Sequence, residues 1–476
     1  MADHPPPPPP HILVFPFPAQ GHALALLDLI HHLSLRRRFS LTVVTTPKNL
    51  PSLAPLLSLH QPPFLNLLVF PLPPHPLLPA GVENVQQIGN AGNLPIITAL
   101  HKLSDPIANW FHSQPDPPVA IISDFFLGWT LALARRLHIP RFAFFSTRAF
   151  LASLNDHLFA DVEAVRDMDP VVFDQLPGSP TFKSEHLPST FRRYVPGNSD
   201  WELVREALLS NLLSDGCVFN TFHALEGPYL DFLRRKMGTQ KVYAVGPVSL
   251  LGTGGDPKNL GDHPGSDVIH WLDHCPDNGS VLYVCFGSQK LMTNHQMEAL
   301  AAALEQSMVR FVWVVKKPGP EMEFSLPDGF QDRVSGRGLV LDGWAPQVTI
   351  LNHPAVGGFL SHCGWNSLLE AVAAGVPILG WPMEADQFVN ARLLVEDLGV
   401  AVKVCEGADT VPDPVELGRR IAQSMSQGLA ERKRAGEMKD EALAAVEQGG
   451  SSQIDLERFV QDLQKLQIEE KGEGIK

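Results

Sequence analysis

Chemistry-bearing side chains are concentrated in one apolar stretch, residues 360–387, which reads LSHCGWNSLLEAVAAGVPILGWPMEADQ. The pattern predicts a strand that ends at His362 and a helix that starts directly afterwards, so Asn366 and Ser367 lie in its first turn. Unpaired N–H groups and the positive end of the helix dipole favour an anion there, such as a phosphate. Glu370, one turn further on, could accept hydrogen bonds from two neighbouring sugar hydroxyls. The stretch therefore indicates a nucleotide site, although the polar residues could instead only cap the helix, with a surface histidine before it.

A second candidate constellation lies in the first half of the chain. His22 directly follows a predicted strand in the segment PAQGH, and Asp124 ends another predicted strand, VAIISD. At a carboxyl edge of one sheet, His22 could act as a general base while Asp124 fixes its tautomer and stabilises the imidazolium. Alternatively, each side chain could do no more than cap a helix. The residues alone leave both interpretations open.

Composition narrows the classes of protein to consider. The chain has 476 residues, 44% of them hydrophobic and 18% charged, so we expect a globular protein of at least two domains. Its net charge of −14 argues against a nucleic-acid partner, because binding to phosphates relies on clustered Lys and Arg. Five cysteines without CxxC spacing fit a reducing compartment and no structural zinc. The chain has neither a GxxxxGK[ST] loop nor a GxGxxG turn, so P-loop and NAD sites lose their main support.

Hydropathy and the first residues predict a cytoplasmic protein. The segment MADHPPPPPP lacks the basic region and long apolar core of a secretory signal, and we expect residues 1–10 to form a proline-rich tail. No window reaches the roughly 18 uninterrupted apolar residues that a membrane-spanning helix needs.

Short β-rich runs alternate with helical patterns, which predicts parallel sheets with helices on both faces. The predicted strands of the first half are 11–17, 40–46, 66–72, 119–124, 141–146, 217–222 and 241–246. Those of the second half are 280–287, 311–316, 338–344, 356–362, 376–382 and 399–404. We expect two doubly wound α/β domains, 11–246 and 268–455, joined by a Gly- and Pro-rich linker, 247–267, and followed by a C-terminal helix and tail, 456–476. Ligands of such sheets bind beyond the carboxyl ends of the strands.

The segment from Trp344 to Gln387, WAPQVTILNHPAVGGFLSHCGWNSLLEAVAAGVPILGWPMEADQ, resembles the signature box of plant family 1 UDP-dependent glycosyltransferases. The segments FPFPAQGH, SDFFLGW and YVCFGS extend the resemblance over most of the chain. It implies the GT-B fold, in which two Rossmann-like domains face each other across a cleft. The first domain would bind mainly the acceptor and the second the UDP-sugar, which is a donor substrate and not a cofactor.

The resemblance also implies a role for each matching position. Uracil would stack on Trp344 and bond the backbone of Ala345, and the ribose would be held by Gln347 and Glu370. The diphosphate would be surrounded by His362, Asn366, Ser367 and Ser288. The sugar hydroxyls would be bound by Trp365, Asp386 and Gln387, with Thr147 contributing from the first domain.

These roles predict an inverting transfer, in which His22 deprotonates an acceptor hydroxyl and the oxygen attacks the anomeric carbon from the side opposite UDP. Because the helix terminus and His362 can stabilise the leaving diphosphate, we expect no metal ion. Glutamine at position 387 resembles the glucose users of the family, so UDP-glucose is the expected donor.

Four phenylalanines of the first half are candidates for binding the acceptor. Phe17, Phe125, Phe126 and Phe145 lie at or beside predicted strand ends and could line an apolar pocket for a phenol, or could be ordinary core. The chain resembles the branch that includes flavonol 7-O-glycosyltransferases, which makes a flavonoid or another small phenol the expected acceptor. Residues 80–98 and 174–200 are predicted to be long loops that set specificity. We expect a monomer; the alternatives are a GT-B nucleotide-sugar epimerase and a non-catalytic phenol-binding protein.

Overall fold

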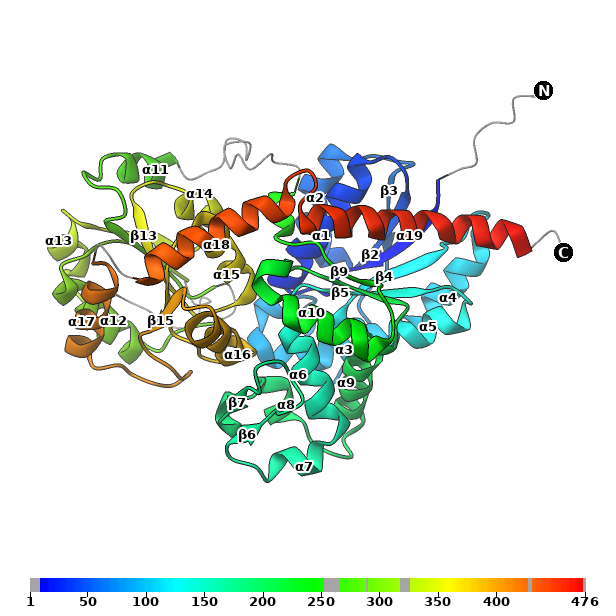
Figure 1. Ribbon diagram of the computed structural model, residues 1–476, viewed down its shortest axis with the longest axis horizontal. Coiled ribbons are helices and arrows are strands. Elements are labelled where there is room, and N and C mark those ends of the chain that lie inside the picture. Colours follow the sequence, from blue (N-terminus) through cyan, green and yellow to red (C-terminus); the bar gives the residue numbers. More distant parts are fainter. Residues whose placement is uncertain (1–8, 252–265, 288–289, 317–325, 427–429, 474–476) are drawn as a thin grey trace. The chain divides into compact units, whose positions relative to one another are not determined.

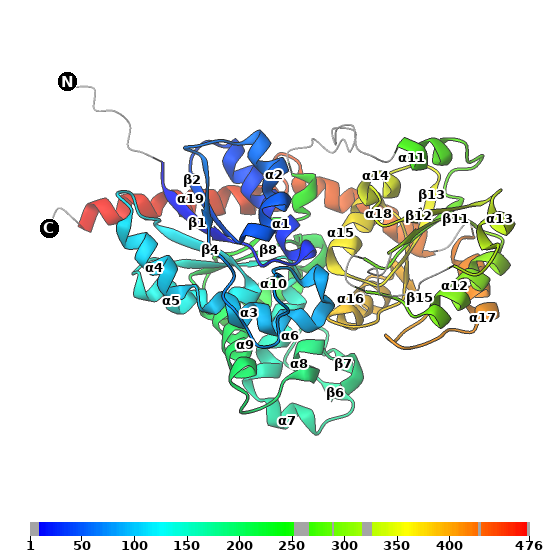
Figure 2. The same ribbon diagram turned by 180° about the vertical axis from the view of Figure 1, so that it is seen from behind.

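The computed structural model describes residues 9–251, 266–287, 290–316, 326–426 and 430–473. The chain divides into two α/β units (Figures 1 and 2). The first unit comprises Met1–Thr181, Arg193–Gly252 and Ala445–Lys476, and the second comprises Phe182–Arg192 and Thr253–Ala444. Most of the expected tail, residues 1–10, and of the expected linker, residues 247–267, lies outside the described residues.

Seven parallel strands form the sheet of the first unit, in the order β3-β2-β1-β4-β5-β8-β9. Their bounds are β1 His11–Phe15, β2 Ser40–Thr45, β3 Leu65–Val69, β4 Ala120–Asp124, β5 Arg141–Phe145, β8 Gly216–Phe219 and β9 Val242–Ala244. Strand β1 pairs with β2 on one side and with β4 on the other, so the strand order reverses between β1 and β4. Open parallel sheets bind their ligands at such a switch point.

Six parallel strands form the sheet of the second unit, in the order β12-β11-β10-β13-β14-β15. Their bounds are β10 Val281–Cys285, β11 Arg310–Val315, β12 Gly338–Asp342, β13 Val356–Ser361, β14 Ile378–Gly380 and β15 Ala401–Lys403. Here the order reverses between β10 and β13, which gives a second switch point. The two parallel sheets confirm the predicted α/β class, and every strand predicted in either half is present.

Helices lie on both faces of each sheet (Figures 1 and 2). In the first unit they are α1 Gln20–Leu35, α2 Leu50–Leu59, α3 Asn93–His101, α4 Ser104–Ser113, α5 Thr130–Arg136, α6 Ala149–Ala160, α7 Val162–Arg166, α9 Ser199–Ser210, α10 His223–Met237 and α19 Ser451–Glu473. In the second they are α11 Ser266–Asp273, α12 Asn294–Ser307, α13 Phe330–Val334, α14 Gln347–Leu351, α15 Trp365–Ala374, α16 Gln387–Arg392 and α17 Pro414–Ser424. Helices α8 Ser189–Arg193 and α18 Ala430–Val446 extend across a unit boundary. Coverage on both faces explains why β4 and β5 are buried along their whole length.

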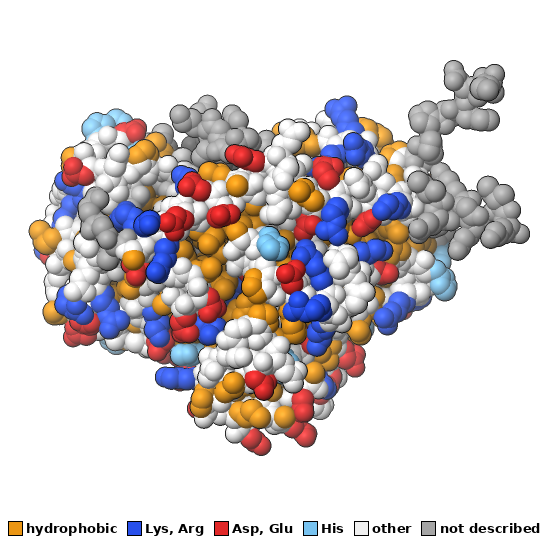
Figure 3. Space-filling view, in the orientation of Figure 1, with side chains coloured by type: hydrophobic (Ala, Val, Ile, Leu, Met, Phe, Trp, Pro, Cys, Tyr) orange, Lys and Arg blue, Asp and Glu red, His pale blue; other side chains and the backbone are white. Residues whose placement is uncertain are grey.

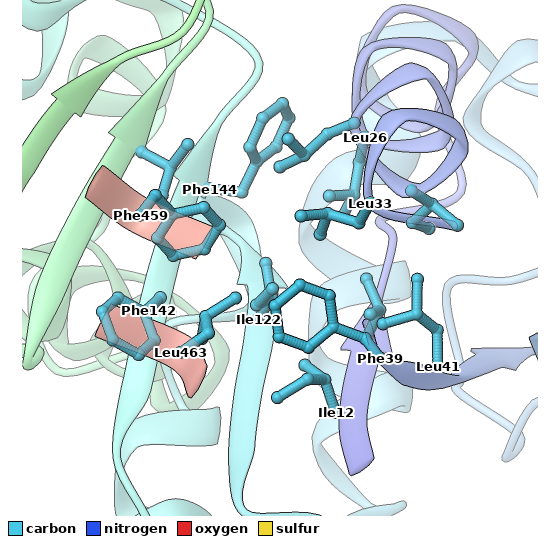
Figure 4. Close-up of a cluster of buried hydrophobic side chains, with 14 of the residues drawn as sticks. Ile12, Leu26, Leu33, Phe39, Leu41, Ile122, Phe142, Phe144, Phe459 and Leu463 are labelled. Carbon is cyan, nitrogen blue, oxygen red and sulfur yellow. The ribbon is translucent and has the colours of Figure 1, made fainter. Parts of the chain in front are cut away.

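Helix α19 completes the core of the first unit. Figure 4 shows Phe459 and Leu463 of α19 and Leu26 and Leu33 of α1 directed at the same strands, and all four side chains belong to one buried cluster. The expected C-terminal helix is therefore present as α19, although not all of its apolar residues are buried. Ile454 is 50% exposed, because the helix turns Leu456 and Val460 toward the sheet instead.

The two segments predicted to be long loops contain regular structure. Residues 80–98 include the start of α3, because Ile96 and Ile97 are buried and draw this part of the segment into the core. Residues 174–200 include strand β7 Thr181–Phe182, which pairs with β6 Val171–Val172, and helix α8. The prediction of continuous loops is therefore wrong in both places.

The surface carries charges of both signs. Figure 3 shows acidic and basic side chains mixed over the visible face. In the part of the chain that the structure describes, no helix combines the length and apolar character needed to cross a membrane.

Candidate functional site

His22 and Asp124 meet at the switch point of the first sheet. Helix α1 begins five residues after β1 ends and carries His22 in its first turn, while Asp124 is the last residue of β4. Because β1 and β4 are neighbours, Nδ1 of His22 lies 3.0 Å from Oδ2 and 3.1 Å from Oδ1 of Asp124. The strand order thus brings together two residues that are far apart in the sequence.

The carboxylate of Asp124 is fully buried and held by further donors. Its Oδ1 accepts the Phe126 N–H over 2.9 Å, and the Ser146 hydroxyl lies 3.4 Å from Oδ2. An ionised carboxylate only accepts hydrogen bonds, so the proton on His22 belongs on Nδ1. The other ring nitrogen, Nε2, is left as the atom that can take a proton, and the His22 side chain is 20% exposed.

Aromatic rings frame His22. Its imidazole stacks on Phe125 and Phe126, with ring centroids 5.1 and 4.7 Å apart, and Phe17 meets it edge-on at 5.3 Å. Phe145 lies one ring further away and stacks on Phe125 at 5.4 Å. All four phenylalanines are under 10% exposed, so most of their surface packs against the protein itself. Their assignment to an acceptor pocket stays a prediction.

Thr147 follows β5, the neighbour of β4, and is 5% exposed. The residues after it begin α6, and Glu226 of α10 accepts the first N–H groups of that helix, those of Ala149 and Phe150, over 3.1 and 2.9 Å. A buried carboxylate at the helix N-terminus therefore fixes the backbone just beyond Thr147.

His362 occupies the corresponding place in the second unit, directly after β13. Its ring is enclosed by Gly287, which follows β10, and by Gly364. A Cβ atom on Gly287 would lie 2.7 Å from Cε1 and Nε2 of His362, and one on Gly364 would lie 2.6 Å from Nε2. Burial lowers the pKa of His362 to about 4, so the ring is neutral at pH 7. Its buried Nδ1 has no hydrogen-bond partner among the described residues.

Helix α15 begins at Trp365, as predicted, and ends where Gly375 takes a left-handed conformation. Trp365 is 5% exposed, whereas Asn366 and Ser367 keep part of their surface in the first turn. The turn before the helix is tight, since Cys363 has a φ of +66°. Asn390 of α16 donates to the Cys363 carbonyl over 2.8 Å and so secures this turn.

The residues expected to hold the ribose form one hydrogen-bonded group. Nε2 of Gln347 donates to Oε2 of Glu370 over 2.6 Å and to the Ser367 hydroxyl over 3.0 Å. The hydroxyl of Tyr283 lies 3.3 Å from Gln347 Oε1. Burial raises the pKa of Glu370 to about 7, and the Gln347 hydrogen bond acts in the opposite direction. Glu370 can therefore exchange a proton near neutral pH.

The residues expected to contact uracil and the sugar lie in two other loops of this unit, after β12 and before α16. Trp344, after β12, is 58% exposed and offers an aromatic face, while Ala345 beside it is buried. Asp386 directly precedes α16, and Gln387 begins it. Oε1 of Gln387 accepts the N–H groups of Met383 and Glu384 over 2.9 and 3.0 Å, which leaves its NH₂ group to donate elsewhere.

The sequence-based assignments omitted Ser146, Tyr283, Gly287 and Asn390. The position of Gly287 at the end of a predicted strand was the one usable signal, because the contacts of the other three depend on which strands and helices become neighbours. Ser288 lies outside the described residues. Within the described ranges, no three His, Cys, Asp or Glu side chains form a group that could hold a metal ion.

The sequence of this chain is similar to those of known proteins. A sequence profile described as UDP-glucoronosyl and UDP-glucosyl transferase matches residues 260–413. The chain is 54% identical over 462 residues to UDP-glycosyltransferase 89A2 of Arabidopsis thaliana, covering 96% of each chain. It is 46% identical over 469 residues to the flavonol 3-O-glucosyltransferase UGT89B1 of the same plant, again covering 96% of each.

A solved structure supports the fold over nearly the whole chain. The crystal structure of Arabidopsis thaliana UGT89C1 complexed with UDP-L-rhamnose matches with a TM-score of 0.79 and 35% identity, covering 96% of this chain and 99% of that one. The same protein complexed with quercetin matches with a TM-score of 0.77 and 34% identity, with the same coverage. The two sequence relatives are named as a glycosyltransferase and a glucosyltransferase, and the solved relative binds UDP-L-rhamnose in one structure and quercetin in another.

Proposed function

Since this chain belongs to the plant family 1 UDP-dependent glycosyltransferases, we propose that it transfers glucose from UDP-glucose to a hydroxyl of a small phenol, with inversion and without a metal ion. Sugar transfer from a UDP-sugar is the activity of the family. The observation that carries the proposed mechanism is the contact between His22 and Asp124 at a sheet switch point.

The acceptor is activated at this pair. Nε2 of His22 takes the proton of the acceptor hydroxyl as its oxygen forms a bond to the anomeric carbon and the bond from that carbon to UDP breaks. The imidazolium that forms is stabilised by the Asp124 carboxylate at Nδ1, 3.0 Å away. Attack from the side opposite UDP inverts the configuration in one displacement, so no covalent intermediate with the protein is needed.

The leaving diphosphate is stabilised by the second unit. Backbone N–H groups at the start of α15 carry the positive end of the helix dipole, and the unpartnered Nδ1 of His362 is placed to donate a hydrogen bond. Trp344 offers an exposed ring for uracil, and Gln347 and Glu370 offer a donor and an acceptor for the ribose. These groups supply the needed charge stabilisation without a metal ion.

Glucose is favoured as the sugar by Gln387 and by the relatives. Because Oε1 of Gln387 accepts two backbone N–H groups, its NH₂ group donates to a sugar hydroxyl, and the carboxylate of Asp386 accepts from a neighbouring one. The relative named as a glucosyltransferase is 46% identical, whereas the one solved with UDP-L-rhamnose is 35% identical.

A phenol is favoured as the acceptor by two observations. Relatives carry flavonol in their names or quercetin in their structures, and three phenylalanines contact the proposed base while a fourth stacks on one of them. A cavity of about 30 Å³ lies beside Phe17 and Ala23, which gives room for about one water and not for a flavonoid. The acceptor therefore needs space beyond this cavity. Which hydroxyl reacts is part of the test below.

We further propose a monomer in the cytoplasm. All five cysteines are free thiols, which is in keeping with a reducing compartment. Light scattering coupled to size exclusion would test the oligomeric state, and a mass near twice that of one chain would overturn it.

The experiment that tests the function is a matrix of phenolic acceptors against UDP-glucose, UDP-xylose, UDP-galactose and UDP-rhamnose, scored by product mass. We expect glucosides as the main products. His22→Ala should lower turnover by about 10² to 10⁴-fold while UDP binding stays near the parent value, because the base does not contact the nucleotide. His112→Ala, which removes an exposed histidine of α4, is the matched control.

Three other results would each contradict a different part of the proposed function. A preference for UDP-rhamnose would overturn the assignment of glucose. An epimerised UDP-sugar formed without any acceptor would favour the epimerase instead. Phenol binding without release of UDP from any donor would favour a binding protein.

A further inference from the structure

Arg141, the first residue of β5, is a charged side chain with no exposed surface. Its guanidinium donates to four oxygens, those of Ser123 Oγ at 3.0 Å, Asn211 Oδ1 at 2.9 Å, Ser214 Oγ at 2.9 Å and the Asp124 carbonyl at 3.4 Å. None of these four acceptors is a carboxylate oxygen. A buried cation is costly to maintain unless it is well paired, so its position beside the proposed active site needs an explanation.

The hydrogen bonds from this cation hold three consecutive residues at the end of β4. Arg141 binds the side chain of Ser123 and the carbonyl of Asp124. Asn211, which accepts from Arg141, donates through Nδ2 to the carbonyl of Phe125 over 2.9 Å. These hydrogen bonds therefore fix the backbone of residues 123–125. This backbone carries the Asp124 carboxylate and the Phe125 ring on which His22 stacks.

The groups beside Arg141 leave its guanidinium charged. Burial lowers its pKa to about 10, and Asp124 and Cys217 act in the opposite direction, so it stays protonated at neutral pH. Burial raises the pKa of Cys217 on β8 to about 12, so that thiol is neutral. The carboxylate of Asp215 accepts the backbone N–H of Arg141 over 3.0 Å.

We propose that Arg141 is a positioning residue for the His22–Asp124 pair, which holds the turn that carries the carboxylate and places a buried positive charge close to it. The proposal rests on the proposed function, since it concerns the residues assigned there as base and partner. It adds a group that touches neither the acceptor nor the UDP-sugar.

The charge has a predictable effect on the pH profile. The active form of the pair has a neutral His22 and an ionised Asp124, and adding a proton to either residue inactivates it. A nearby positive charge disfavours that proton on both residues. Removing the charge of Arg141 should therefore move the acid limb of kcat/KM to higher pH.

The experiment compares pH profiles of kcat/KM for the parent and Arg141→Gln, with UDP-glucose and a phenol whose hydroxyl stays protonated over the range. We expect the midpoint of the acid limb to rise by about one pH unit in Arg141→Gln. Arg141→Lys keeps the charge but not the four hydrogen bonds, so its midpoint should stay near the parent value while kcat falls. Ser214→Ala is the matched control, because it removes one acceptor of Arg141 and leaves the partners of the hydrogen bonds to residues 123–125 in place.

A second variant tests the charge should Arg141→Gln fail to fold. Asn211→Asp places a carboxylate against the guanidinium and reduces its field with almost no change in volume. It also removes the donor to the Phe125 carbonyl, so kcat should fall as well. It should also move the acid limb upward.

A lower rate with an unchanged midpoint in Arg141→Gln and Asn211→Asp would show that Arg141 only supports the fold, and would overturn the proposal. This outcome is distinct from failure of the proposed function. If the proposed function is wrong, the parent protein forms no glycoside, or the His22→Ala variant retains the turnover of the parent.

Discussion

Gln347 donates through Nε2 to Oε2 of Glu370 over 2.6 Å, which joins the first residue of α14 to the second turn of α15. Burial disfavours the ionised form of Glu370, and the single amide donor offsets only part of this cost. The pKa of Glu370 therefore remains raised to about 7. This titration lies near neutral pH and has consequences for binding.

We predict that a UDP-sugar binds more tightly as the pH rises from 6 to 8. Glu370 is proposed to accept hydrogen bonds from the ribose hydroxyls, so binding should favour its ionised form and release a proton where Glu370 is partly protonated. Calorimetry of UDP-glucose without acceptor, in two buffers of different ionisation enthalpy, measures that proton. His362, with its pKa lowered to about 4, does not titrate in this range.

Glu370→Gln is the control for this effect. It should bind more weakly at pH 8 and lose the pH dependence. The stability effect has the opposite sign, because a carboxyl whose folded pKa exceeds its unfolded value destabilises the protein as the pH rises from about 4.5 to about 7. The variant should therefore gain in melting temperature relative to the parent on going from pH 5 to pH 8.

Gly287→Ala should impair donor binding. The added methyl group would lie 2.7 Å from the His362 ring, and the residue has a φ of +75°. We expect KM for UDP-glucose to rise roughly tenfold or more, the scale of forcing a methyl group into a packed site. Gly329→Ala carries the same kind of backbone strain, with a φ of +66°, but meets only the end of the Arg333 side chain. Equal donor KM values in the two variants would contradict the role of His362.

Gln387→Glu separates two tasks of one side chain. It keeps an oxygen for the N–H groups of Met383 and Glu384 but replaces the donating NH₂ group. Turnover with UDP-glucose should fall by roughly one to two orders of magnitude while the melting temperature stays near the parent value. Gln387→Ala should lose both activity and stability. Full activity of Gln387→Glu would mean that the residue only accepts the N–H groups of Met383 and Glu384 and does not bind the sugar.

Asp124→Asn should be slow even though it is nearly isosteric. An amide NH₂ facing Nδ1 of His22 favours the tautomer with its proton on Nε2, which cannot accept another. We expect a loss of about 10² to 10⁴-fold with a weakly acidic phenol, and a smaller loss with a phenol that is already ionised at the assay pH. Asp105→Asn, which changes a side chain of α4 that is 77% exposed, should keep the parent rate. Equal losses with both phenols would remove the pair from proton transfer.

Chelation with EDTA should leave the rate unchanged. The start of α15 and His362 are proposed to carry the diphosphate charge, so no divalent ion has to be supplied. A rate that collapses and returns with Mg²⁺ or Mn²⁺ would overturn this. The Asp-x-Asp triplet at 167–169 would then be the first place to substitute.

Much of the fold could be predicted because both sheets are parallel and covered on both faces. Their strands are short buried runs between turn residues, and this pattern is visible without an alignment. Helix α19 shows the limit of periodicity. Positions 456, 459, 460 and 463 follow helical spacing and form its buried face, yet Ile454 was an equally apolar candidate.

The site was predictable where chemistry coincides with a strand end. Asp124 ends a strand, His362 directly follows one, and His22 lies in the first turn of the helix after one. Each could therefore be assigned to the carboxyl edge of its sheet from the sequence. The support provided by Arg141, Asn211 and Asn390 could not. Their hydrogen bonds depend on side-chain packing between elements far apart in sequence, and no local pattern encodes it.

The place of α19 in the first unit bears on how this protein is made. Phe459 and Leu463 cover Phe142 and Tyr243, and Tyr243 donates to Asp462 over 2.6 Å. The ribosome therefore produces the cover of this sheet last, after the whole second unit. Until residue 463 leaves the exit tunnel, the nascent first unit exposes an apolar face, and a fragment ending near residue 250 keeps that face exposed permanently. Such a fragment is expected to depend on chaperones or to aggregate where the complete chain does not.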